Sequence, residues 1–503
     1  MTAFVAAKDS PLHLGRGDDF SRVRNFLQTA AFDELNVCRA LGVKSMGNLG
    51  AADWKKCPLE AVPPPLRWCL QVFMRGQFAD HHESRTICGP EIFDAFCSLG
   101  LLRPARKIPT AVVCPVWLYP CDGFLIASDR TDDPDGDVFQ PGEDVVFPAI
   151  YPGTLRFLEL LPDAQKGEAL DLCGGSGIGA LHLSRNAQSA TTTDLAERSA
   201  VFANFKGHLN GINLESVCGD LYEPVRERQF GLITAHPPFV PAVGPNMVYR
   251  DGGDTGEEIT RRIVAGLPAH LRPGGTCVIL CVAIDTEKAT FEKRAKEWLG
   301  PEQDHFDLVY GCEKILSVDE VIASLRRGQK SPNDHETQKL SERLRSINTR
   351  QFPYGALFIR RLTGAAAQEP LRLQLTPAGR AADFERVLAW RELARRPDFS
   401  AWLVNLRPRL ANQLELTIRH AMRDGELVPV QCTFAVEAGF QAALRPDGWI
   451  VPVVARLNGG KSVREIFEEA RSANELPSAF TLDAFAGLVS QMITHGFIIP
   501  DDV

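Results

Sequence analysis

A glycine-rich turn constrains the fold of this chain most strongly. The segment 169–179 reads ALDLCGGSGIG, so a short apolar stretch enters a turn that contains four glycines. Glycine lets the backbone turn sharply and lets a ligand approach the main chain closely. A buried strand that passes through such a turn into a helix is typical of nucleotide-binding βαβ units. The sequence therefore predicts an α/β fold with a ligand site at this turn.

A carboxylate at a fixed distance supports this interpretation. Asp194 lies 23 residues after Asp171 and follows three threonines. At the end of the next strand of a βαβ unit, such a carboxylate faces ribose hydroxyls. The alternative is a purely structural turn in a Rossmann-like domain that binds another nucleotide.

Asp171, Cys173, Gly175 and Gly177 resemble the acidic-x-Gly-x-Gly-x-Gly motif of the class I S-adenosylmethionine-dependent methyltransferases, with cysteine in place of the first glycine. The resemblance implies S-adenosylmethionine as the cofactor and a Rossmann-like sheet of seven strands. The cofactor contacts that it implies are Asp171, Cys173, Gly174, Gly175, Gly177, Asp194, Leu195, Asp220, Leu221 and His236.

Asp220 follows Gly219 and resembles the acidic turn after the third strand, which meets the adenine amino group in that family. Gly-Asp pairs are also common in turns and helix caps, so a structural role is the alternative.

The segment His236-Pro237-Pro238-Phe239 is similar to the Asn/Asp-Pro-Pro-Tyr/Phe signature of methyltransferases that act on planar nitrogens. In that family the first side chain accepts a hydrogen bond from the target NH2 group, and the aromatic ring stacks on it. The resemblance therefore implies His236, Pro237 and Phe239 as catalytic residues. Histidine in the first position leaves an amine, an amide or a hydroxyl open as the acceptor. An ordinary proline-stiffened loop is the alternative.

Further residues are candidates for the acceptor pocket. Tyr151 and Thr154 precede the first predicted strand of the sheet, although Thr154 could instead cap a helix. Tyr249 and Arg250 open a Gly/Asp-rich loop, 249–257, before a helix expected near Glu258; a flexible surface turn is equally compatible with that loop. Pro238 completes the predicted substrate contacts.

The pattern of apolar residues predicts that the chain is divided into three domains. We expect a mainly helical N-terminal domain at 1–108, a methyltransferase domain at 109–362 with a β-rich lead-in at 109–150, and an α+β accessory domain at 371–503. Residues 448–503 loosely resemble winged-helix modules, including PqqD-like domains that hold peptides. A polar insertion at 317–351 is expected to be a solvated excursion, with a lid as the alternative. The predicted sheet strands are 168–173, 190–194, 215–218, 230–235, 276–284, 305–311 and 354–361.

Composition and charge limit the classes of partner that we expect this protein to bind. The net charge is -8 over 503 residues, and no dense basic cluster occurs, so nucleic acid is disfavoured as a substrate. The 13 cysteines show no CxxC pairs or metal-ligand spacing, which indicates reduced thiols and no metal site. With no signal peptide and no apolar stretch of membrane-span length, we expect a cytoplasmic protein.

These features favour methyl transfer from S-adenosylmethionine to a nitrogen of a small molecule or a polypeptide side chain. We expect the flanking domains to select the acceptor or to assemble a homodimer. Two alternatives are open: O-methylation with His236 as general base, and a regulatory protein that binds the cofactor without turnover.

Overall fold

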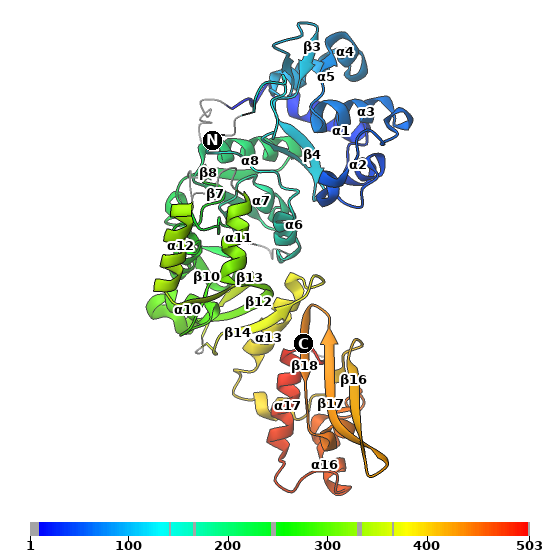
Figure 1. The fold of residues 1–503 in the computed structure, drawn as a ribbon, viewed down its shortest axis with the longest axis vertical. Helices are drawn as coiled ribbons and strands as arrows, with labels where there is room; N and C mark the ends of the chain where they lie inside the picture. The colour runs from blue at the N-terminus through cyan, green and yellow to red at the C-terminus, as the bar shows by residue number, and fades with distance from the viewer. Residues whose placement is uncertain are drawn as a thin grey trace. The chain divides into compact units, whose positions relative to one another are not determined.

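The computed structural model describes residues 10–139, 142–163, 167–242, 248–328, 334–364 and 367–500. Figure 1 shows the chain coloured from blue at its N-terminus to red at its C-terminus. Contacts within the chain divide it into two compact units. The first comprises residues 1–281 and 324–346, and the second comprises 282–323 and 347–503. None of the described helices has the length and apolarity that crossing a bilayer requires.

The first unit contains five parallel strands in the order β8-β7-β6-β9-β10. Strand β6 is buried over four of its five residues, as expected for a parallel strand covered on both faces. The strands are β6 Glu168–Leu172, β7 Ser189–Asp194, β8 Leu214–Cys218, β9 Phe230–Ala235 and β10 Leu271–Val282. The helices of this region are α6 Pro152–Glu159, α7 Ile178–Leu183, α8 Glu197–Asn210 and α9 Glu258–His270.

The N-terminal region of this unit is mainly helical and packs on α8. Phe20 meets Phe205 of α8 edge to face at 5.1 Å. Lys206, which is fully buried, donates to the Ala127 carbonyl oxygen at 2.8 Å. The elements are α1 Asp19–Thr29, α2 Glu34–Leu41, α3 Pro64–Cys69, α4 His81–Cys88, α5 Pro90–Ser98, β1 Ala79–Asp80, β2 Arg103–Pro104, β3 Ala111–Val113, β4 Trp117–Cys121 and β5 Phe124–Ser128.

The second unit contains a sheet in the order β13-β12-β14-β18-β17-β16, with β11 beside β13. Its C-terminal part has an apolar core that includes Trp390, Phe434, Val453 and Phe485. The strands are β11 Asp285–Thr286, β12 Phe306–Leu316, β13 Thr349–Arg361, β14 Leu371–Leu375, β15 Arg409–Leu410, β16 Glu415–Arg423, β17 Glu426–Glu437, β18 Phe440–Leu444 and β19 Ile498–Ile499. The helices are α10 Phe291–Trp298, α13 Ala381–Leu393, α14 Phe399–Leu403, α15 Val451–Val454, α16 Val463–Ser472 and α17 Leu482–Thr494.

The α/β fold class and all seven predicted strands are confirmed, with β10, β12 and β13 longer than expected. The helical character of the N-terminal region is confirmed as well. The three-part division and the winged-helix likeness stay predictions, and residues 365–366 of the expected linker lie outside the described residues.

The polar insertion differs from the expected solvated excursion. It forms two helices, α11 Val318–Gly328 and α12 Asp334–Ser346. Leu340 and Leu344 of α12 are buried, and Arg343 pairs with Asp254 of the Gly/Asp-rich loop. The apolar positions four residues apart give α12 a packing face, which a count of polar residues does not reveal.

Candidate functional site

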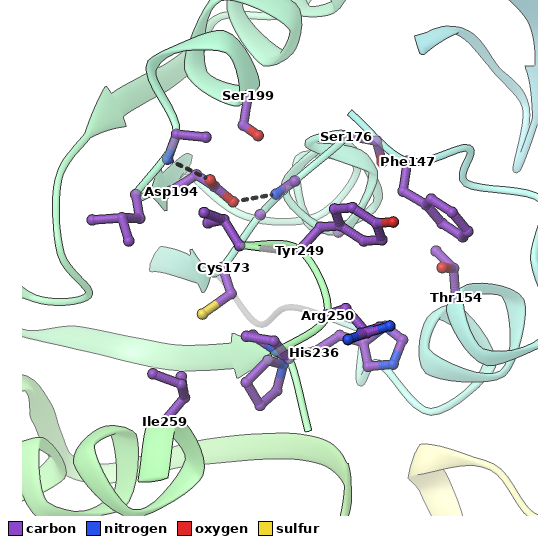
Figure 2. A pocket seen from close by; sticks show the side chains of 18 of the residues that line it. Phe147, Thr154, Cys173, Ser176, Asp194, Ser199, His236, Tyr249, Arg250 and Ile259 are labelled. Carbon is purple, nitrogen blue, oxygen red and sulfur yellow. Dashed lines mark hydrogen bonds between the residues drawn. The ribbon is translucent and has the colours of Figure 1, made fainter. Parts of the chain in front are cut away.

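A cavity of about 660 Å³ opens at the carboxyl ends of β6, β7 and β9 in the first unit. Ligands of open parallel sheets bind at this end, because loops from successive strands converge there. The volume is within the ~300–1,000 Å³ of small-molecule sites. Figure 2 shows side chains from these loops around one space.

The glycine turn forms the floor of the cavity. A side chain at Gly174 would place its Cβ 1.9 Å from Thr192 Oγ1, so no larger residue fits there without a shift. Gly175 faces open space with φ at +49°, so its backbone is exposed to a ligand. Cys173 is also left-handed, with φ at +55°, which is unfavourable for a residue with a Cβ. The backbone at this position therefore explains why glycine is the usual choice in the motif that the sequence resembles.

Asp194 is held at the end of β7 with its carboxylate toward the turn (Figure 2). Its two oxygens accept from the backbone N–H groups of Gly175 and Ala196, at 2.8 and 2.9 Å. Burial raises the pKa of Asp194, and the two N–H donors oppose that shift. Each carboxylate oxygen retains a lone pair that can accept a ligand hydroxyl.

Asp171 lies beneath the turn. Thr234 Oγ1 donates to its carboxyl at 2.9 Å, and the Ala180 N–H of α7 is a second donor. Burial raises the pKa of Asp171 to about 7, although both donors lower it. Asp171 therefore ties the turn to α7 and β9, and its proton state changes near neutral pH.

His236 follows β9 and lines the cavity (Figure 2). Its imidazole stacks on Phe157 at 5.4 Å and lies 5.8 Å from the ring of Phe239. Desolvation lowers the pKa of His236 to about 4, so the ring is neutral at physiological pH. No hydrogen bond to this ring occurs within the described part of the chain, which leaves its nitrogens available to a ligand.

The Gly/Asp-rich loop is paired with the proline segment. Val240 N donates to Arg250 O at 3.1 Å, and Gly252 N donates to Val240 O at 2.8 Å. Glu258 at the start of α9 accepts from the backbone N–H groups of Thr255 and Gly256. These bonds join the loop to the proline segment, and Tyr249, Arg250 and Asp251 of the loop line the cavity.

Three aromatic rings form a stack along the cavity wall. Phe147 lies between Tyr151 and Tyr249, with centroids at 4.3 and 5.3 Å. The three side chains are between 38% and 42% exposed. We call Phe147, Tyr151 and Tyr249 the aromatic rim. Sequence reasoning selected both tyrosines and missed Phe147, although an aromatic residue four positions before Tyr151 was a usable signal.

The structure brings the predicted site residues together, with one exception. Gly177 does not line the cavity: its α carbon faces Ala203, and a Cβ there would lie 2.6 Å from the Ala203 methyl. Asp220 lines the cavity and also pairs with Arg262 of α9 at 2.6 Å. The other predicted residues on the wall are Tyr151, Thr154, Asp171, Cys173, Gly174, Gly175, Asp194, Leu195, Leu221, His236, Pro237, Pro238, Phe239, Tyr249 and Arg250. Lining residues that the sequence did not indicate include Asp144, Phe147, Gly153, Phe157, Ser199 and Ile259.

Comparison with known families identifies the part of the chain that carries the cavity. Residues 149–294 match the methyltransferase small domain. This segment is similar to methyltransferase small domains. It holds the glycine turn, Asp194 and the proline segment, so the resemblance stated from these residues is confirmed. No group of three or more His, Cys, Asp or Glu side chains in the described ranges is placed to hold a metal.

Curated relatives of the methyltransferase small domain act on proteins and on RNA. The ribosomal protein uL3 glutamine methyltransferase of Bradyrhizobium diazoefficiens is 28% identical over 27% of this chain and 50% of its own length. The release factor glutamine methyltransferase of Xylella fastidiosa is 31% identical over 24% of this chain and 49% of its own. The ribosomal RNA small subunit methyltransferase C of Alcanivorax borkumensis is 26% identical over 22% and 30%. The chain thus spans about half the length of the first two.

Solved structures share a lower sequence identity with this chain than the curated relatives do. The T. thermophilus 16S rRNA N2 G1207 methyltransferase, in complex with AdoMet and guanosine, is 18% identical, covers 56% of this chain and 63% of its own, and has a TM-score of 0.27.

Proposed function

We propose that this protein transfers a methyl group from S-adenosylmethionine to a planar nitrogen, in an amide or amine of a polypeptide side chain or a small molecule. The observation that carries the proposal is a neutral His236 ring in the same cavity as the glycine turn and Asp194. The glutamine methyltransferases among the relatives support an amide nitrogen in a protein.

The cofactor is S-adenosylmethionine, whose sulfonium supplies the methyl group. The residues present fit this molecule. Asp194 offers carboxylate lone pairs to the ribose hydroxyls, and Gly175 leaves open space where a side chain would stand. Asp220, two residues after β8, would meet the adenine amino group, while its bond to Arg262 orients the carboxylate.

His236 would position the acceptor. A neutral imidazole nitrogen accepts one hydrogen bond from the acceptor N–H, and Phe239 offers a flat apolar face beside it. The adjacent prolines restrict the backbone, so little conformational entropy is lost when the acceptor binds. The nitrogen can lose its proton after the methyl group arrives, so this transfer needs no strong base in the cavity.

O-methylation is disfavoured by the same histidine. A hydroxyl acceptor needs a base whose pKa is close to the working pH, and the apolar neighbours of His236 lower its pKa to about 4. One cavity extends from the glycine turn to the proline segment, so the proposed cofactor and acceptor contacts share the same space. This arrangement suits catalysis, and no specific observation favours a role in which the cofactor binds without turnover.

Calorimetry with S-adenosylmethionine and S-adenosylhomocysteine tests the cofactor site. We expect binding by the wild type, at least tenfold weaker binding by Asp194→Ala, and unchanged binding by Asp163→Ala, an exposed aspartate outside the cavity. Transfer of a labelled methyl group to protein and small-molecule amides then tests the acceptor class. Absence of cofactor binding by folded wild-type protein would overturn the proposal.

A further inference from the structure

Strand β16 is a free edge of the sheet in the second unit. It stands at the end of the strand order, and β17 is its only strand partner among the described residues (Figure 1). Eight of its nine residues are exposed, and Ala421 is half-buried. A long exposed edge presents unpaired N–H and C=O groups, which a second strand can satisfy.

This edge also carries an apolar face. Leu416 and Ile418 stand opposite Phe434 and Cys432 of β17, so they continue the face that packs into the C-terminal core. Leu416 and Ile418 are each 43% exposed, and Met422 and its cross-strand neighbour Leu427 are 67% and 69% exposed. Water therefore covers an apolar stripe along an unpaired strand, and a partner strand would cover part of it.

The sequence of β16, ELTIRHAMR, is complementary to itself in the antiparallel direction. With Arg419 on a two-fold axis, Glu415 of one copy stands opposite Arg423 of the other, at both ends of the strand. Leu416 then faces Met422, and Ile418 faces His420. Opposite charges and apolar pairs directly across strands stabilise pairing, whereas the single Arg419 pair opposes it. Neither Glu415 nor Arg423 forms a salt bridge within the described ranges.

We propose that β16 pairs antiparallel with β16 of a second copy of this chain, in a symmetric dimer centred on Arg419. A two-fold axis perpendicular to the sheet keeps the apolar stripes of both copies on one face, because residues of equal parity stand opposite each other. The sheets of the two copies would then join through these edge strands into one continuous sheet.

Charge reversal in the full-length protein tests this pairing. Glu415→Arg alone and Arg423→Glu alone each place like charges at both ends of the strand pair, so we expect the dimerisation constant from sedimentation equilibrium to fall by about tenfold or more. The double variant Glu415→Arg/Arg423→Glu restores opposite charges at both ends and should recover the wild-type constant. Both positions, 415 and 423, are exposed, and circular dichroism verifies that each variant is folded.

Cysteine cross-linking provides a second measurement. Opposite residues in an antiparallel pair have Cα atoms about 4.5–5.5 Å apart, which a disulfide can bridge. Arg419→Cys on the axis should therefore form a disulfide-linked dimer above the wild-type background. Thr417→Cys is the matched control, because the two copies of residue 417 would lie about 14 Å apart along the strands.

Three outcomes would overturn the proposal: a monomer at all concentrations, a dimer that the single charge reversals leave intact, or single variants that the double variant does not rescue. A monomer whose edge instead takes up an added extended peptide would assign β16 to peptide binding.

Discussion

Phe157 of α6 stacks on His236 after β9, with ring centroids 5.4 Å apart and planes inclined by 25°. The ring centroid of Phe239 lies 5.8 Å from that of the imidazole, and a Cβ at Gly153 would come within 3.6 Å of the imidazole Cε1. These neighbours cover part of the imidazole and desolvate it, while His236 as a whole stays half-buried at the cavity. His236 is therefore a neutral hydrogen-bonding group, and its environment bears directly on the kind of acceptor that the cavity can take.

The pH dependence of methyl transfer follows from this environment. Because the pKa of His236 is lowered to about 4, the ring stays neutral at higher pH, and protonation removes its acceptor nitrogen only as the pH falls towards 4. We expect the contribution of His236 to kcat/KM to be constant from pH 6 to 8.5. An inflection between pH 6 and 7 that disappears in His236→Asn would contradict this and favour general-base catalysis.

Substitution of His236 separates positioning from base catalysis. His236→Asn keeps a side chain that can accept a hydrogen bond and should retain most of the activity. His236→Ala removes that acceptor and should lower kcat/KM by about tenfold to a hundredfold, as for a lost hydrogen bond of about 1–3 kcal/mol. Affinity for S-adenosylhomocysteine, measured in parallel, shows whether each variant keeps its cofactor site.

Asp171→Asn should change the pH dependence of stability. Burial raises the folded-state pKa of Asp171 to about 7, so between about pH 4 and 7 the folded chain holds a proton that the unfolded chain has lost. The wild type therefore loses stability as the pH rises through this window, and the asparagine variant lacks that loss. In urea unfolding at pH 5, 6, 7 and 8, we expect the difference in unfolding free energy to move in favour of Asp171→Asn up to pH 7 and then to level off. A difference that stays constant with pH would contradict this.

Gly174→Ala should disrupt the turn through one specific contact. Its Cβ would stand 1.9 Å from Thr192 Oγ1, an atom without a hydrogen-bond partner among the described residues. We expect a loss of about 1–3 kcal/mol of stability from overpacking, together with weaker cofactor binding. Thr192→Ala removes the obstructing hydroxyl, so the double variant Gly174→Ala/Thr192→Ala should recover part of both losses. Equal losses in the single and double variants would show that the clash is not the cause.

Phe147→Ala tests the aromatic rim. Removing the central ring breaks both stacking contacts, each worth about 0.5–1.5 kcal/mol. We expect KM for the acceptor to rise about threefold to tenfold, with the Kd of S-adenosylhomocysteine within twofold of wild type. Phe78→Ala is the control, because Phe78 is similarly exposed at 40% and does not line the cavity. A loss confined to cofactor binding would assign the rim to the cofactor instead.

The sequence by itself determined the strand series, the glycine turn and the proline segment, because each depends on residues close together along the chain. The apolar run before Gly174 and the spacing from Asp171 to Asp194 are local patterns, which can be recognised in the sequence itself. Gly177, predicted as a cofactor contact, shows the limit of such patterns: spacing placed it in the turn, whereas packing against Ala203 turned it away from the cavity.

Only the tertiary structure decided the chemistry of the cavity. Phe147 and Tyr249 lie far apart in the sequence and stack because the segment before α6 and the Gly/Asp-rich loop border the same space. The hydrogen bonds of Val240 to Arg250 and Gly252 place the Gly/Asp-rich loop beside the proline segment, which the sequence alone left open. The pKa values of His236 and Asp171 depend on desolvation by residues from several elements, and burial of this kind is a property of the packed chain that no local pattern contains.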